Sequence, residues 1–139
     1  MIDQIKNIFD IASQSLSAQQ VRLNTIASNI ANAHTKVGNP DKAYRPLKPV
    51  FETIMSERTG ETGMSTVGIA EIVALKRTPE KIHEPDNPAA DKDGFVYQSP
   101  VNQEEELVEM LDASRAYQNN LEVISTLRSL MVRTIDIGK

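Results

Sequence analysis

The sequence predicts an α+β protein in which a long helix at each end of the chain forms an antiparallel coiled-coil pair and a small β-rich domain lies between them. The first observation is where proline and glycine fall, because both residues are costly inside a helix. All seven prolines and five of the six glycines lie between residues 38 and 100. The second is that apolar residues at both ends recur at alternating spacings of three and four, the pattern of a coiled-coil seam. We therefore divide the chain into residues 1–35, 36–101 and 102–139.

The N-terminal helix is predicted over residues 3–32. Its apolar stripe, broken only by one glutamine, consists of Ile2, Ile5, Phe9, Ala12, Leu16, Gln19, Leu23, Ile26, Ile30 and Ala33. The other faces are rich in amide and hydroxyl side chains, and the charged residues of this segment are Lys6, Arg22, Asp3 and Asp10. A helix with a solvated outer face normally carries Lys and Glu there. The uncharged surface therefore indicates packing against other helices on more than one side, as in a multi-subunit bundle, and a monomeric helical hairpin explains it less well.

The C-terminal helix is predicted over residues 103–136. Its stripe has two polar exceptions and consists of Leu107, Met110, Ser114, Tyr117, Leu121, Ile124, Arg128, Met131 and Ile135. Asn102 is a favoured N-cap and three glutamates follow it at the positive end of the helix dipole, while Gly138 is suited to the C-terminal end. At a rise of ~1.5 Å per residue each helix would be about 45–50 Å long, so we expect an elongated molecule.

The central segment shows weaker signals for short strands. Residues 50–55 alternate in polarity, and residues 67–75 are β-branched and apolar. A third strand is predicted at residues 95–97, directly after the turn signal Asp93-Gly94. Three short strands form a small sheet at most, and we expect the helices to support it.

The composition excludes several classes of function. A net charge of −4 leaves no basic surplus for a run of phosphates, so nucleic acid is not an expected partner. The absence of cysteine excludes disulfides, thiolate metal sites and cysteine nucleophiles. No stretch approaches the ~18 apolar residues of a membrane span, and the first residues lack a cleaved secretory signal. Without a phosphate loop or a nucleophile elbow, we expect no enzyme activity, no catalytic residue, no cofactor and no small-molecule substrate.

One group of residues offers metal-ligand chemistry. Glu80, His83 and Glu84 would support the alternative hypothesis of a metal-dependent hydrolase, because histidine and carboxylates bind divalent metals. No second histidine follows at the spacing of a helical metal motif, however, and Pro79 and Pro85 flank the segment. Solvated loop charges explain the pattern more simply, and we expect no metal site.

Two motifs, one near each end, resemble a known family. Residues 27–35, ASNIANAHT, resemble the N-terminal motif of the bacterial flagellar axial proteins, the rod and hook family. Residues 113–124, ASRAYQNNLEVI, resemble the C-terminal motif of the same family. Between them, residues 84–97, EPDNPAADKDGFVY, look like the segment typical of proximal rod proteins of the FlgC type. The resemblance covers about residues 5–139.

The resemblance implies a structural subunit of the proximal rod of the flagellar basal body. Such a subunit would be exported unfolded through the flagellar type III apparatus and would reside in the rod, in the periplasmic space. Its terminal helices would form an axial core domain and polymerise into a tube that transmits motor torque to the hook and filament. The implied partners are other copies of the chain, other proximal and distal rod subunits, the protein at the junction of rod and MS ring, and the export apparatus.

The stripes and motifs together predict the residues that carry assembly. In the N-terminal helix they are Ile5, Phe9, Leu16, Leu23, Ile26, Asn29, Ile30, Ala31, Asn32 and Thr35. In the C-terminal helix they are Leu107, Met110, Ser114, Arg115, Tyr117, Asn120, Leu121, Ile124, Met131 and Ile135. The alternative from another class is a soluble helical adaptor or export chaperone, which would be a stable monomer or dimer in the cytoplasm.

Overall fold

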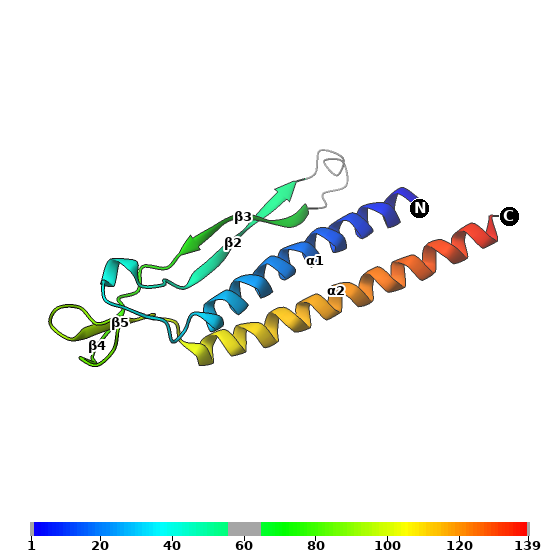
Figure 1. Ribbon diagram of the computed structural model, residues 1–139. Helices are drawn as coiled ribbons and strands as arrows, with labels where there is room; N and C mark the ends of the chain where they lie inside the picture. The colour runs from blue at the N-terminus through cyan, green and yellow to red at the C-terminus, as the bar shows by residue number, and fades with distance from the viewer. Residues whose placement is uncertain (1, 56–64, 139) are drawn as a thin grey trace.

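The computed structural model describes residues 2–55 and 65–138 of the protein. Its long helices, α1 (Ile2–Ala31) and α2 (Gln103–Ile137), pack side by side and run antiparallel, so both chain ends lie at the same end of an elongated molecule (Figure 1). The predicted helix boundaries agree with the observed ones to within one residue at every end. At ~1.5 Å per residue the helices are about 45 and 53 Å long. The α+β class is confirmed.

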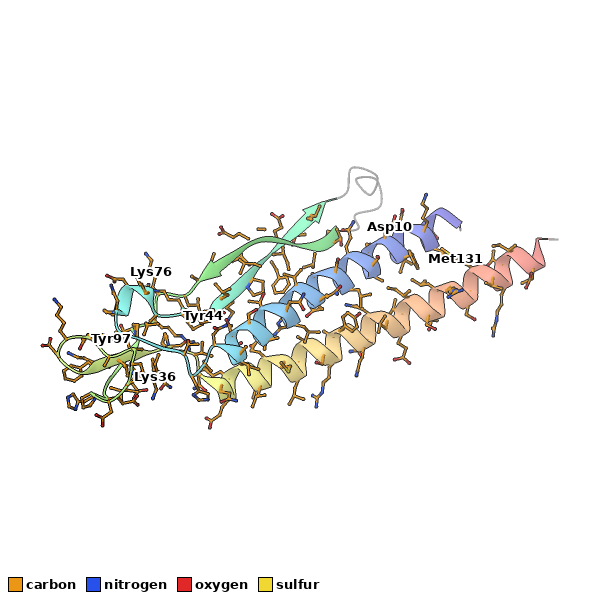
Figure 2. The ribbon with its side chains drawn as sticks, viewed as in Figure 1. Asp10, Lys36, Tyr44, Lys76, Tyr97 and Met131 are labelled. Carbon is orange, nitrogen blue, oxygen red and sulfur yellow. The ribbon has the colours of Figure 1, made fainter. Side chains whose placement is uncertain are left out.

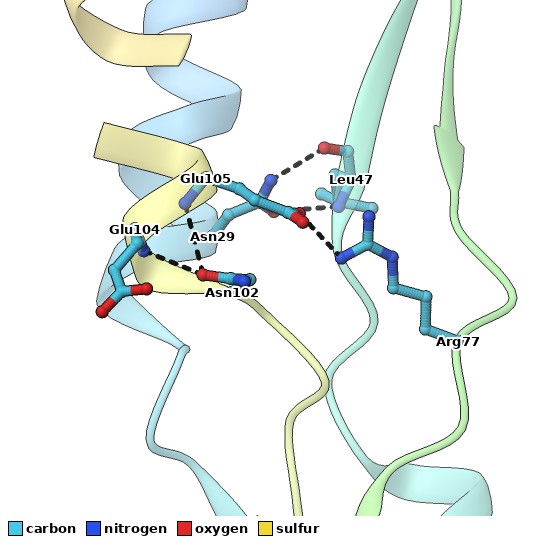
Figure 3. Close-up of polar contacts among 6 residues, drawn as sticks. All are labelled: Asn29, Leu47, Arg77, Asn102, Glu104 and Glu105. Atoms are coloured by element: carbon cyan, nitrogen blue, oxygen red, sulfur yellow. Dashed lines mark hydrogen bonds and ion pairs between the residues drawn. The ribbon is translucent and has the colours of Figure 1, made fainter. Parts of the chain in front are cut away.

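Side-chain and backbone caps define both ends of α2. The Asn102 side-chain oxygen accepts hydrogen bonds from the backbone N–H groups of Glu104 at 3.0 Å and Glu105 at 3.2 Å (Figure 3). This satisfies two amides that have no partner within the helix, as the sequence predicts. At the other end the Gly138 N–H donates to the carbonyl oxygens of Thr134 and Ile135, each at 3.2 Å.

A long β-hairpin lies along α1 on the side away from α2 (Figure 1). It consists of β2 (Leu47–Met55) and β3 (Ser65–Ala74), antiparallel strands in which Leu47 lies opposite Ala74. The register shifts between Val50 and Phe51, where a bulge interrupts the pairing. The strands predicted at residues 50–55 and 67–75 are therefore confirmed, although both begin two or three residues earlier than expected.

A second, separate sheet lies at the end of the molecule opposite the chain ends. Its order is β1 (Lys36–Val37), β5 (Phe95–Gln98), β4 (Glu80–His83), all antiparallel. Figure 2 shows Lys36 and Tyr97 in this sheet, while Asp10 and Met131 lie toward the other end of the helices. The expectation of a single small sheet is wrong, because the described strands form two sheets. Strands β1 and β4 were not predicted, because they are too short and too polar to produce a periodic signal.

The turn before β5 positions this sheet. The Asp91 side chain accepts hydrogen bonds from the backbone N–H groups of Asp93 at 3.0 Å and Phe95 at 2.8 Å. Gly94 has a φ of +78°, a left-handed conformation that favours glycine. These contacts lead into Val96, which is fully buried at the centre of the sheet.

Candidate assembly surfaces

The hairpin is attached to α1 through the side chain of Asn29. This side chain is 1% exposed, and its Nδ2 group donates to the Leu47 carbonyl oxygen at 2.8 Å. Its Oδ1 atom accepts from the Leu47 N–H at 2.8 Å and from the Tyr44 hydroxyl at 2.9 Å (Figure 3 draws the contacts with Leu47). One amide therefore pairs with both backbone groups of the first residue of β2, so it acts as an additional position of the strand ladder.

Two neighbouring residues of the same motif shape the end of α1. The Asn32 side chain donates to the Ser28 carbonyl oxygen at 2.8 Å, and the Thr35 hydroxyl donates to the Asn32 carbonyl oxygen at 2.7 Å. The Thr35 carbonyl oxygen in turn accepts from the Ser99 N–H at 3.0 Å. The polar residues of the N-terminal motif thus terminate the helix and join it to the segment that leads into α2.

Ion pairs link α2 to the rest of the molecule near its N-terminal end. Arg22 on α1 donates to Glu109 at 2.5 Å, and Arg77 after β3 donates to Glu105 at 3.1 Å (Figure 3 draws the second pair). The hydrogen bond from Arg22 is the main cause that lowers the pKa of Glu109, against an opposing effect of partial burial. Burial, and next the charge of Glu106, raises the pKa of the Tyr44 phenol.

The face of α2 that is turned inward follows a three-four spacing, but half of it lies one residue from the predicted stripe. Buried and partly buried positions along this face are Glu106, Met110, Ala113, Tyr117, Asn120, Ile124, Leu127, Met131 and Thr134, and the partly buried Glu109, Ser114 and Ala116 lie beside it. Ala113 is fully buried, whereas Leu107 and Leu121 lie on the exposed flank. The reason is size, because the distance between two packed helices depends on the side chains at the contact and small ones allow a close approach. Arg128 is exposed, and Leu127 takes the buried position beside it.

The predicted assembly residues therefore divide by exposure. Those that are buried or partly buried are Ile5, Phe9, Leu16, Leu23, Ile26, Asn29, Ile30, Asn32, Met110, Ser114, Tyr117, Asn120, Ile124 and Met131. Those that remain exposed are Ala31, Thr35, Leu107, Arg115, Leu121 and Ile135. The first group packs largely within the chain, and the second is available to a neighbour. Their role in assembly stays a prediction.

The uncharged surface of α1 is only partly open. Thr25 and Asn29, two of its polar residues, are buried, and Asn29 faces the hairpin. The part that remains exposed carries the small or uncharged side chains of Ser13, Ser17, Gln20, Asn24, Ala27, Ser28 and Ala31. The hairpin, whose position along α1 the sequence did not specify, thus covers one of the faces assigned to other helices.

The residues considered for a metal site do not converge. The Glu84 carboxylate accepts hydrogen bonds from the Lys36 ammonium and from the Asn87 amide, and these bonds lower the pKa of Glu84. The His83 ring packs edge-on against Phe95, with ring centroids 4.9 Å apart. Among the residues that the structure describes, no group of three or more His, Cys, Asp or Glu side chains is arranged to hold a metal ion. Within the same residues, no helix has the length and apolar character needed to cross a bilayer.

Both ends of the chain match families of flagellar proteins. Residues 9–36, which contain the N-terminal motif, match the family described as flagella basal body rod protein. Residues 92–137, which contain β5 and all of α2, match the family described as flagellar basal body rod FlgEFG protein C-terminal. The two long helices are therefore the shared element of a class of rod proteins.

Whole-chain relatives narrow this class. The flagellar basal-body rod protein FlgC of Yersinia enterocolitica is 41% identical, and that of Salmonella typhimurium is 39% identical, each over 96% of this chain and 97% of the relative. FlgC of Aquifex aeolicus is 32% identical over 97% of this chain and 98% of the relative. The chain belongs to the FlgC type of flagellar basal-body rod proteins. This is a family of structural, non-enzymatic proteins of the motility apparatus.

Proposed function

We propose that this protein is a structural subunit of the proximal rod of the flagellar basal body, and that its terminal helices polymerise into a tube that transmits motor torque to the hook and filament. The observation that carries the proposal is the exposed apolar flank of α2. Leu107, Leu111, Leu121 and Ile135 are between 43% and 61% exposed, although α2 already packs on α1 with another face. Four large apolar side chains exposed along one flank of a helix are typical of a surface that a neighbouring subunit covers.

We infer that α1 and α2 form an antiparallel coiled-coil pair within an axial core domain made of residues 1–35 and 102–139. The three-four spacing of the inward positions of α2 supports this pairing. Residues 36–101 would form the outer, β-rich domain. In the tube, the exposed flank of α2 in one copy would pack on the small, uncharged side chains that remain open on α1 of another.

The partners and the location of the subunit follow from the proposed role in the rod. Its partners would be further copies of itself, other proximal and distal rod subunits, the protein that joins the rod to the MS ring, and the type III export apparatus that delivers it. The place of the assembled protein would be the rod, in the periplasmic space. Contacts that repeat without closing would produce a helical assembly. Because this assembly would transmit torque, stiffness would be its functional property.

The test uses a residue that the fold does not need. Leu121 is 43% exposed, so Leu121→Asp should leave the unfolding transition of the purified chain nearly unchanged while it places a charge in the proposed subunit contact. We expect cells that carry this variant to be non-motile and their purified basal bodies to lack the protein. Leu121→Met, which conserves apolar character and approximate volume, is the matched control and should preserve motility.

Two outcomes would count against the proposal. Normal motility with Leu121→Asp present in basal bodies at wild-type amounts would show that this flank is not an assembly surface. Wild-type protein that stays in the cytoplasm as a stable monomer or dimer, and does not sediment with basal bodies, would favour the alternative of a soluble helical adaptor or export chaperone.

A further inference from the structure

A bulge divides the hairpin of β2 and β3 into two halves. Ala70 of β3 is an extra residue with no partner on β2, because the register of the pairing shifts between Val50 and Phe51. Such a bulge interrupts the hydrogen-bond ladder and bends the strand that contains it. We call residues 47–50 and 71–74 the basal half of the hairpin, and residues 51–55 and 65–69 the distal half.

The two halves are attached to α1 in different ways. In the basal half, both backbone groups of Leu47 pair with the buried side chain of Asn29. Between residues that the structure describes, these are the only hydrogen bonds that join β2 or β3 to α1. Within the same residues, the distal half is therefore held against α1 by packing alone.

The packing between the distal half and α1 is incomplete. A groove of about 320 Å³ lies between them, with Ser17, Ala18 and Val21 of α1 on one side and Ile54 and Gly68 of the hairpin on the other. One water molecule needs only about 10–15 Å³ of such volume, so the groove has room for several waters. Atoms that line a gap have no packing partners on that side. The distal half is therefore bound to α1 less tightly than the basal half.

A buried hydroxyl group weakens the distal half further. Thr66 lies opposite Ile54 in this half and is 5% exposed. Its Oγ1 atom is buried and has no hydrogen-bond partner among the residues that the structure describes. A hydroxyl buried in this way has lost its bonds to water without gaining others, and it regains them when water reaches it. The observed position of the distal half thus carries a free-energy penalty that a more open position would remove.

We propose that the distal half is a strap that swings away from α1 about the bulge, while Asn29 keeps the basal half fixed. A few residues at the end of a regular element are sufficient for such a hinge. The swing uncovers Ala18, which is 4% exposed under the strap, and Val21 one turn along the same helix. Both belong to the uncharged part of α1, so the strap controls access to this surface. The inference concerns the isolated chain and does not depend on the proposed function.

The absence of native cysteine allows a direct test by thiol reactivity. Ala18→Cys places a thiol under the strap. Ala12→Cys is the matched control, because Ala12 lies in the apolar stripe of the same helix and is 6% exposed. Each full chain is treated with iodoacetamide at about pH 8, without urea and at low urea concentrations. We expect Ala18→Cys to react at least about tenfold faster than Ala12→Cys and at a rate that low urea hardly changes, because a local swing is enough to expose it.

A second substitution tests the cause of the swing. Thr66→Val removes the unpartnered hydroxyl, so it should slow the reaction of Ala18→Cys at least about fivefold and leave that of Ala12→Cys unchanged. Thr53→Val, at an exposed position of the same half, is the matched control and should change neither rate by more than about twofold.

Three results would overturn the inference. The first is equal reaction rates of Ala18→Cys and Ala12→Cys that rise together with urea, since global unfolding would then expose both thiols. The second is a rate for Ala18→Cys that Thr66→Val does not lower, and the third is an equal slowing of both thiols by Thr66→Val. If Ala18→Cys alters the circular dichroism spectrum, Val21→Cys under the strap and Leu16→Cys in the stripe, both partly buried, take the places of the two cysteine variants.

Discussion

Replacing Asn29 by alanine should release the hairpin from α1. The substitution removes three hydrogen bonds, two to the backbone of Leu47 and one to the Tyr44 hydroxyl. If all three partners stayed dry, an unsatisfied group would cost about 1–3 kcal/mol each. Leu47 and Tyr44 are only partly buried, however, so water can reach their polar groups once Asn29 is gone. We therefore expect a loss of about 2–4 kcal/mol in the free energy of unfolding.

Urea unfolding followed by circular dichroism measures this loss as a shift of the midpoint at constant slope. Hydrogen exchange adds a local readout, because the Leu47 amide should lose protection in the variant by more than amides in the interior of α2. Asn32→Ala is the matched control. It removes one local hydrogen bond to Ser28 at an exposed position and should cost less than about 1 kcal/mol. Equal losses for the two variants, with unchanged Leu47 protection, would refute the role assigned to Asn29.

Three further substitutions test contacts within the chain. Gly38→Ala should lower the free energy of unfolding by about 1–3 kcal/mol, because a Cβ there would lie 2.5 Å from the backbone oxygen of Ala89, which cannot move aside. Gly68→Ala should lower the free energy of unfolding by less than about 1 kcal/mol, since the added Cβ would meet the movable end of the exposed Ile54 side chain. A lower urea midpoint for Gly68→Ala than for Gly38→Ala would contradict this reasoning. Glu109→Gln should cost about 0.2–1 kcal/mol near neutral pH, a small value because the carboxylate is solvent-accessible. The pKa of Glu109 in the folded protein lies below the unfolded value of 4.5. The contribution of this carboxylate to stability is therefore full above pH 4.5 and disappears as the pH falls through the folded pKa. Below that pH the unfolding curves of the variant and the wild type should converge.

Helix positions could be predicted from the sequence because they depend on local chemistry. Proline and glycine are absent from both helices, and the side chain of Asn102 caps the first turn of α2 in the expected way. The strands of the hairpin were also recognisable, since residues 50–55 alternate in polarity and residues 67–75 are apolar and rich in β-branched side chains. Strand β4 was not, because its four residues, EKIH, offer neither alternation nor length, and only pairing with β5 makes them a strand.

The contacts between elements were harder to predict, for two physical reasons. Periodicity ranks positions by apolar size, and so it favoured Leu107 and Leu121 over their neighbours Glu106 and Asn120, which lie on the inward face of α2. Hydrogen bonds to a distant backbone leave no periodic trace at all. Asn29 was recognised as part of a motif, but its partner, Leu47, is specified by the path of the chain between them.

The sequence distances between contacting residues indicate an order of folding. Asn29 and Leu47 are 18 positions apart, whereas Arg22 and Glu109 are 87 positions apart. Closing the longer loop costs about 1.4 kcal/mol more in chain entropy, so α1 and the hairpin can associate before α2 docks. The last element to dock is also the one with the broad exposed apolar flank. In a subunit that reaches its neighbours as an incompletely folded chain, completion of the fold and addition to the assembly would then be a single late event.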